Sequence, residues 1–419
     1  MISHAPKPRP TTAISFPVIL LAVIGVAVLG FALGPAIVYS TSPDAPRNDF
    51  LSFYAAPQLL LQGKLYDHAA EEELHLRLGW KPDQHKVAFI RPPFYAVLLT
   101  PLTLLDYRSA YITWQLLSAG AWCLSAVLWS HIGPRAVVLA FAWSLPAWFA
   151  WLRGQDVIFV FLLASIGLAL FRRGWLFAAG LVFALCGIKW NLFIPLPFLL
   201  IARREYRTLT GWGTGCTTLL VTSFLSCGLD WPARYFHAIL LPSAAPNRSQ
   251  MLSVNSLMPE GSYGYLFELL LCIMLSCLAY KYASCALSSA TVAVGLLAGL
   301  LISHHAYLYD GLTATPACVL LTRLTSFRYR VVGVLLLTPM IVGLLLSQTL
   351  SFLPQVLLAT ALLVLTRTGT GRGNIGCDYG DQRPRTGSEA SSFFKATRRH
   401  IASFALSKSR YCRAYLTPT

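Results

Sequence analysis

The chain has 419 residues, of which 56% are hydrophobic and only 12% are charged, and its mean hydropathy is +0.59. Soluble globular domains carry about twice this charged share, so the composition excludes a protein with an ordinary water-exposed surface. The net charge of +16 does not indicate a nucleic-acid-binding protein. The basic residues form short clusters between apolar runs, which is the pattern that the positive-inside rule describes for membrane proteins.

The apolar runs are continuous rather than alternating, which favours membrane helices over the strands of a barrel. The first run, 14–39, follows a short segment, 1–13, that carries Lys7 and Arg9. A cleavable signal has a shorter apolar core, so the sequence predicts a retained first helix with a cytoplasmic N-terminus.

A long polar segment, 40–93, follows this helix and is expected to form an outer, extracytoplasmic loop. The next apolar run, 94–105, is short and contains Pro101, so we expect it to be re-entrant or partly embedded.

The complete pattern predicts an all-α integral membrane protein with about twelve transmembrane helices in a membrane domain, 14–366. Both termini then lie on the cytoplasmic side. The predicted spans are 14–39, 109–131, 135–152, 156–171, 174–188, 190–202, 208–228, 263–280, 286–302, 308–322, 331–348 and 350–366.

Charge placement supports this count. The expected inner loops hold a set of arginines: Arg135, Arg172, Arg173, Arg203, Arg204, Arg207, Arg323, Arg328 and Arg330. The expected outer segments instead collect the unusual polar residues, at 40–93, Arg153–Gln155, Lys189, 229–262 and Ser303–Tyr307. This segregation predicts an extracytoplasmic site. The two short spans on either side of Lys189 are the weakest point of the twelve-span prediction.

The last segment, 367–419, carries ten basic and three acidic residues and is expected to be a disordered cytoplasmic tail. The ten cysteines include no CxxC pair and lie mainly in apolar runs, so they indicate small buried residues rather than metal ligands or disulfides. The outer loops offer no matching ligand set for a metal, and the sequence predicts a site without one.

Two ionisable residues stand out from their surroundings. Asp49 lies about ten residues beyond the first helix and precedes an apolar stretch that would hold it at the membrane surface. It could act as a general base on a hydroxyl, or it could be a solvated loop acid. Lys189 interrupts an apolar stretch, which makes it either a functional residue or a side chain that extends to the interface.

Several short motifs occur in order along the chain. Asp49-Phe50 is followed by Phe53-Tyr54-Ala55-Ala56, by Leu65-Tyr66-Asp67 and by Pro92-Pro93. Further along come Gly154-Gln155, Arg172-Arg173-Gly174, Ala179-Gly180 leading to Lys189, and Ser303-His304-His305 before Tyr309-Asp310. In order and spacing this series, over most of residues 45–320, resembles glycosyltransferase family 87.

The chain departs from the family pattern at three places. The usual Tyr-Pro-Pro is Arg91-Pro92-Pro93, the usual Lys-Pro is Lys189-Trp190, and the usual Ser-Pro-His is Ser303-His304-His305. Each motif alone is weakly specific, and the specificity comes from their order.

The resemblance implies a C-type glycosyltransferase architecture with a catalytic acid in the long first extracytoplasmic loop, 40–93. Asp49 matches that acid. Donor phosphate and substrate contacts are expected from Arg47, Tyr54, Arg91, Arg153, Lys189, His305, Tyr309 and Asp310. Asp310 could orient His305, pair with Lys189 or Arg153, or make a purely structural hydrogen bond. No cofactor is expected, because a lipid-phosphate-linked sugar is itself the donor substrate.

The leading hypothesis is a hexosyltransferase, and more narrowly a mannosyltransferase, in the plasma (inner) membrane. Its donor would be a polyprenyl-phosphate sugar and its acceptor a glycolipid or envelope glycan. Two alternatives share parts of the pattern. A twelve-helix transporter has the same span count, but the two halves of the chain show no convincing similarity. A polyprenyl-linked glycan polymerase or ligase tends to place its large loop later in the chain.

Overall fold

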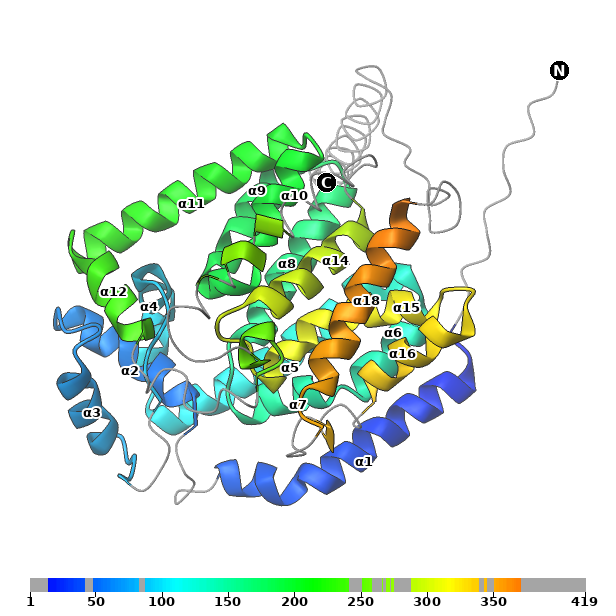
Figure 1. Cartoon of the computed structure of the whole chain (residues 1–419). Coiled ribbons are helices and arrows are strands. Elements are labelled where there is room, and N and C mark those ends of the chain that lie inside the picture. The colour runs from blue at the N-terminus through cyan, green and yellow to red at the C-terminus, as the bar shows by residue number, and fades with distance from the viewer. Residues whose placement is uncertain are drawn as a thin grey trace, which may run out of the picture. The chain divides into compact units, whose positions relative to one another are not determined.

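The computed structural model describes residues 14–41, 48–82, 87–240, 251–257, 266, 269–271, 273–274, 288–338, 343–344 and 350–370. In these residues all regular elements are helices, with one isolated β-bridge between Met251 and Tyr307. The chain is therefore all-α, as predicted (Figure 1).

The first half of the described chain contains α1 Phe16–Thr41, α2 Phe50–Leu61, α3 His68–Arg77, α4 Pro93–Leu99, η1 Thr100–Leu104, α5 Tyr107–Trp129, η2 Ser130–Ile132, α6 Pro134–Ala142, α7 Leu145–Leu152 and α8 Val157–Arg172. The second half contains α9 Leu176–Leu185, η3 Cys186–Leu192, α10 Pro195–Ala202, α11 Tyr206–Cys227, α12 Trp231–Leu240, η6 Val254–Leu257, α14 Ser289–Ile302, η7 Leu308–Ala314, α15 Thr315–Thr322, α16 Phe327–Leu337 and α18 Leu353–Thr370.

Two helical stretches, Phe16–Ala36 and Tyr107–Ile132, are long and apolar enough to cross a membrane, and α6 with α7 gives a third if that bent pair is one span. Several shorter apolar helices accompany them. The membrane character of the sequence is thus confirmed, whereas the count of twelve spans stays a prediction. The predicted span 263–280 lies mostly outside the described residues, as does the tail 371–419.

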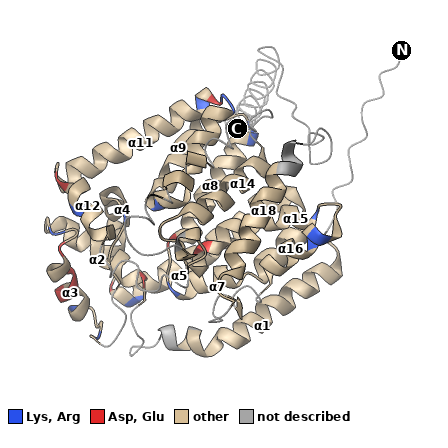
Figure 2. Cartoon of the chain, viewed as in Figure 1, with Lys and Arg blue, Asp and Glu red and all other residues tan. Residues whose placement is uncertain are grey.

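Large apolar side chains point outward from the long helices. Phe31 in α1 is 88% exposed, Leu116 in α5 is 70% exposed and Leu225 in α11 is 83% exposed. Such surfaces are unfavourable in water and suit contact with lipid. The distribution of charge agrees with this. In Figure 2 most helices are tan along their length and the charged residues lie near helix ends, with α3 as the exception.

One predicted span is broken. The run 135–152 bends by 46° between α6 and α7. Pro146 cannot continue the hydrogen bonding of α6, and the hydroxyl of Ser144 accepts a hydrogen bond from the Ala147 amide at 3.3 Å, which starts α7 as a new helix.

The two predicted spans 174–188 and 190–202 form three pieces, α9, η3 and α10. Within η3 the backbone of Lys189 has φ −126° and ψ 59°, outside the helical range. The run 94–105 forms α4 and then η1, which begins next to Pro101, so it is short, as expected.

Three of the predicted inner loops, at His131–Arg135, Phe171–Gly174 and Arg323–Arg330, lie close to one another at one end of α8. The Nη1 atom of Arg323 donates to the carbonyl of Ile132, and His131 Nε2 lies 2.7 Å from the hydroxyl of Ser289. Arg172, at the end of α8, is close enough to act electrostatically on His131. Helix α8 has 16 residues, so its first residue lies about 24 Å from this end. The opposite ends of α5, α8 and α14 lie near Asp49, Asp156 and Ser303, and the site described below is built there.

Candidate active site

Asp49 occupies the position immediately before α2 and is half-buried. Its carboxylate accepts a hydrogen bond from Nε2 of Gln155 through Oδ2. The neighbouring Asn48 donates from Nδ2 to the Tyr111 hydroxyl at 2.9 Å and to the Leu152 carbonyl at 3.1 Å. The start of α2 is thereby attached to α5 and α7.

The turn that carries Gln155 is built on Gly154, which has φ +65°. A Cβ at this position would lie 2.7 Å from Cβ of Phe50, so only glycine permits the turn to approach α2 this closely. The indole Nε1 of Trp114 donates to the Gly154 carbonyl at 3.0 Å. The turn therefore holds Gln155 against the chain at Asp49.

Arg91 and Asp156 form a bidentate ion pair beside this turn. Nε of Arg91 lies 2.6 Å from Oδ2 of Asp156, and Nη2 lies 3.0 Å from Oδ1. Both side chains are buried. Burial alone lowers the pKa of Arg91, but the charge and hydrogen bonds of Asp156 outweigh it and hold the pKa above its ordinary value.

The backbone around Arg91 is also anchored. The hydroxyl of Tyr66 donates to the Arg91 carbonyl at 2.6 Å, and the Phe89 amide donates to Glu71 Oε1 at 2.8 Å. The guanidinium carbon lies 5.8 Å from the centre of the Phe53 ring. Arg91 is thus fixed in place by contacts on several sides.

Lys189 and Asp310 form a second buried ion pair, between Nζ and Oδ1. The ammonium also lies 5.0 Å from the centre of the Tyr309 ring, and the other carboxylate oxygen of Asp310 accepts from the Tyr307 amide at 3.0 Å. Among the predicted roles of Asp310, the structure shows the one that pairs it with Lys189. The kink of η3 at Lys189 turns the side chain toward this carboxylate.

Close backbone contact positions η3. A Cβ on Gly299 of α14 would overlap the carbonyl oxygen of Leu192, so the absence of a side chain lets the two backbones touch. On the other side Asn191 Nδ2 donates to the Ser303 hydroxyl at 2.6 Å and to the His305 carbonyl at 3.0 Å. Asn191 therefore connects the segment that carries Lys189 to the segment that carries His305.

His305 lies in the turn between α14 and η7. Neither ring nitrogen makes a hydrogen bond within the described residues. Burial lowers the pKa of His305 to about 3. The nearby His304 acts in the same direction, the Ile239 carbonyl acts against it, and Arg91 and Lys189 add smaller lowering effects. The imidazole is therefore neutral at physiological pH in the ligand-free protein.

These residues act on one another electrostatically. Tyr309 lies within range of Asp49, Asp310 and Arg91, and Asp156 lies within range of Lys189. We refer to the set as the polar cluster, which consists of Asp49, Arg91, Gln155, Asp156, Lys189, His305, Tyr309 and Asp310. Residues from five separate parts of the chain thus meet at one end of α8 and α14.

Two predicted residues, Tyr54 and Arg153, are not part of the polar cluster, and the structure does not describe a third. The Tyr54 hydroxyl donates to the Leu105 carbonyl at 2.7 Å, which is a packing contact with the end of η1. Arg153 is exposed, although its backbone adjoins Gly154. Arg47 lies outside the described residues.

Sequence reasoning missed Asp156 and the roles of Gln155 and Asn191. Asp156 had a usable signal, since it is a carboxylate directly before an apolar run. Buried acids at membrane depth need a partner, although the sequence alone does not show which basic residue supplies it. In the described part of the chain no three His, Cys, Asp or Glu side chains are grouped as metal ligands, and the prediction of a site without metal stays a prediction.

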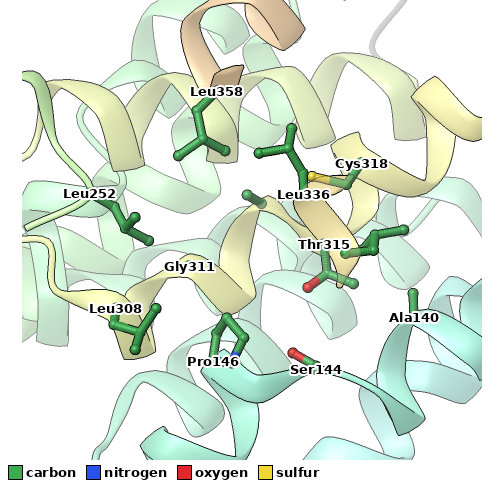
Figure 3. Close-up of a pocket in the computed structure, with 12 residues that line it drawn as sticks. Ala140, Ser144, Pro146, Leu252, Leu308, Gly311, Thr315, Cys318, Leu336 and Leu358 are labelled. Atoms are coloured by element: carbon green, nitrogen blue, oxygen red, sulfur yellow. The ribbon is translucent and has the colours of Figure 1, made fainter. Parts of the chain in front are cut away.

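A narrow, mostly apolar pocket lies beside the polar cluster, against η7 (Figure 3). Leu308 and Gly311 of η7 line it together with Pro146 of α7, Leu252 and Leu358. Ser144 and Thr315 contribute hydroxyl groups to the lining and Cys318 contributes a thiol. None of the predicted site residues lines this pocket.

The family model of glycosyltransferase family 87 matches residues 89–263. This confirms the predicted resemblance over the part of the chain that contains Arg91, Gln155, Asp156 and Lys189. Asp49, His305 and Asp310 lie outside the matched range. Family 87 implies a glycosyltransferase, and its members are membrane proteins. A search of curated proteins and a search of solved structures each found no match.

Proposed function

We propose that this chain is a membrane hexosyltransferase that transfers a sugar, mannose in the first instance, from a polyprenyl-phosphate donor. The acceptor would be a lipid-linked or cell-envelope hydroxyl, and the reaction would take place on the extracytoplasmic face. One observation carries the proposal. A half-buried carboxylate, Asp49, lies in the same cluster as two buried cations, within a chain of the glycosyltransferase class.

The chemistry of such a transfer needs the groups that this cluster holds. Asp49 would take the proton from the acceptor hydroxyl as its oxygen attacks the anomeric carbon of the donor sugar. The bond from that carbon to the phosphate oxygen breaks, and the lipid phosphate leaves with the electron pair. A phosphate leaves readily as an anion, so the reaction needs no strong general acid. It proceeds in a single displacement with inversion.

The leaving phosphate needs a positive charge to stabilise it. The two buried cations differ in how many of their hydrogen-bond donors are already occupied. Arg91 is occupied by Asp156 on two of its nitrogens. Lys189 has a single carboxylate oxygen and the Tyr309 ring as partners, and an ammonium is a compact charge that can redirect its hydrogen bonds. We therefore assign the direct phosphate contact to Lys189, with Arg91 contributing a fixed positive potential.

His305 would act as a neutral group in the free enzyme. Its imidazole can accept or donate one hydrogen bond to a sugar hydroxyl without carrying charge. A bound phosphate would raise its pKa by adding a nearby negative charge. Both properties are compatible with a place beside the donor.

The proposal is tested with membranes from cells that produce the chain. Radiolabelled polyprenyl-phosphate hexoses and the matching nucleotide sugars are supplied separately, and the lipid fraction is analysed for labelled product. We expect product from a polyprenyl-phosphate hexose in chain-containing membranes and none in membranes without the chain. Product from nucleotide sugars alone would contradict the donor class. Uptake of a labelled solute without any glycosylated product would favour a transporter.

A further inference from the structure

Gln155 contacts Asp49 through an uncharged amide group. It is 4% exposed, and its Nε2 donates to Oδ2 of Asp49. We propose that Gln155 is a positioning residue that fixes the Asp49 carboxylate in the orientation needed to accept a proton. The proposal rests on the proposed function, in which Asp49 is the general base.

The amide can perform this role because its own backbone is held on both sides. The Gln155 amide nitrogen donates to the Ala150 carbonyl at 2.8 Å, which closes the end of α7. The preceding Gly154 is pressed against Phe50 and bonded by Trp114. The following Asp156 is fixed by its ion pair with Arg91. Gln155 therefore cannot move away from Asp49 without breaking contacts in α5, α7 and the segment at Arg91.

The orientation of the amide follows from the chemistry of its partner. An ionised carboxylate only accepts hydrogen bonds, so the NH₂ end of Gln155 must face Asp49. The Gln155 carbonyl oxygen is buried and makes no hydrogen bond within the described residues. In the described chain, the contact with Asp49 is thus the hydrogen bond that sets the direction of this side chain.

An uncharged donor is suited to a base. A neighbouring arginine or lysine would lower the pKa of a carboxylate by about 1–3 units and make it a poorer proton acceptor. An amide holds one oxygen through a hydrogen bond without adding a full positive charge.

The experiment compares the purified wild-type chain with Gln155→Leu and Gln115→Leu under single-turnover conditions, using a polyprenyl-phosphate hexose as donor. Gln115 is a matched control, because it is also a buried glutamine and its Nε2 donates at 2.6 Å to the Tyr111 hydroxyl and at 2.8 Å to the Trp151 carbonyl, not to Asp49. We expect Gln155→Leu to lower the transfer rate about 10- to 100-fold with little change in the donor concentration for half-saturation. This is less than the roughly 100- to 10,000-fold loss typical when a general base itself is removed, as expected for misplacement of the base.

The pH profile separates positioning from a merely structural role. Loss of a hydrogen bond to the charged form raises the pKa of a carboxylate, so the acid limb of the rate in Gln155→Leu should move to higher pH. Gln155→Glu places a second acid beside Asp49 and should move the limb further in the same direction. Gln115→Leu should lower thermal stability and leave the limb where it is in the wild type.

A wild-type rate in Gln155→Leu would overturn the proposal, and so would a rate loss with the acid limb unchanged. Asp49→Asn distinguishes this failure from failure of the proposed function. If Asp49→Asn is inactive while Gln155→Leu behaves as wild type, only the positioning role is wrong. If Asp49→Asn retains transfer, the general-base assignment is wrong as well.

Discussion

At the scale of single residues, the stability of the site depends on charges that are buried as pairs. The side chains of Lys189 and Asp310 are 4% and 1% exposed, so neither charge has water to stabilise it if the other is removed. Loss of one partner of a buried pair typically costs about 3–5 kcal/mol, whereas replacement of both by apolar groups can be nearly neutral.

We therefore expect Lys189→Met and Asp310→Leu each to lower the stability of the detergent-solubilised chain by about 3 kcal/mol or more. The double variant should be less destabilised than the sum of the two. Denaturant unfolding of the four proteins measures this coupling. Strictly additive effects would contradict a direct pair.

His305 predicts a dependence of stability on pH. Its pKa is about 3 in the folded chain and ordinarily 6.5, so below pH 6.5 the unfolded chain binds a proton that the folded chain does not. Stability should therefore fall as the pH falls from 6.5 toward 3. At pH 5, which is 1.5 pH units below the unfolded pKa, this group should lower the free energy of unfolding by about 2 kcal/mol, at 1.36 kcal/mol per unit.

The check is a comparison of unfolding at pH 7 and pH 5 for the wild type and His305→Gln. The variant cannot gain this proton, so its stability should fall less between the two values. An equal loss of stability in both proteins would show that other groups cause the pH dependence.

Sequence reasoning could identify some of these residues and not others. Lys189, Asp310 and Asp49 stand out because ionisable residues are costly near apolar runs. The pairing of Arg91 with Asp156 could not be read from the chain, because the two are 65 positions apart and only the packing of α8 against its neighbours brings them together. Tyr54 matched the family motif, yet its hydroxyl serves packing at Leu105.

At the scale of elements, small residues decide how closely helices approach. A Cβ on Gly180 of α9 would overlap the Thr208 carbonyl oxygen, and a Cβ on Gly211 of α11 would overlap that of Phe177. In the same helix as Gly211, a Cβ on Gly213 would meet nothing within 4 Å. These three glycines therefore offer a matched set.

Gly180→Ala and Gly211→Ala should each destabilise the protein by more than about 1–3 kcal/mol, because the obstacle is backbone that cannot move aside without separating the helices. Gly213→Ala should be neutral or stabilising by up to about 1 kcal/mol, since alanine is the better helix former. Thermal unfolding in detergent ranks the three variants. A strong effect of Gly213→Ala together with a weak one of Gly180→Ala would contradict the close α9–α11 contact.

The helix breaks show why element boundaries were harder to predict than helix content. Apolar composition alone predicts one span over 135–152. In the structure, the hydroxyl of Ser144 caps a new helix in front of Pro146. Hydropathy likewise could not predict the η3 kink at Lys189, whose side chain pairs with Asp310, 121 positions away. Local composition determines that these segments are helical, but hydropathy does not show the caps and kinks at which they stop.

At the scale of the whole molecule, the described chain has two chemically different ends. Arginine-bearing loops contact one another near His131 and Arg323, and the polar cluster lies at the opposite ends of α5, α8 and α14. Charge parity in the sequence predicts that the two ends face opposite sides of the membrane, and this orientation stays a prediction. The sequence could not determine how many of the shorter apolar helices cross the bilayer, because length and hydropathy are marginal for each of them.

Accessibility of single cysteines tests the orientation. In a background without the native cysteines, Lys64→Cys, in the exposed segment after α2, should react with a membrane-impermeant maleimide added to intact cells. Arg173→Cys, in the exposed turn after α8, should react only after the membrane is opened. The reverse pattern would place the polar cluster on the cytoplasmic side and contradict the proposed topology.

The central claim is that Asp49 is the general base of a sugar transfer from a lipid phosphate. The most direct test is the initial rate of transfer from a polyprenyl-phosphate hexose by the purified chain in proteoliposomes, for the wild type and Asp49→Asn. Asparagine has nearly the same shape and can still accept a hydrogen bond from Gln155, so unfolding should be little affected. We predict a rate at least about 100-fold lower in the variant, as expected for loss of a general base. A rate within a few-fold of the wild type would contradict the account.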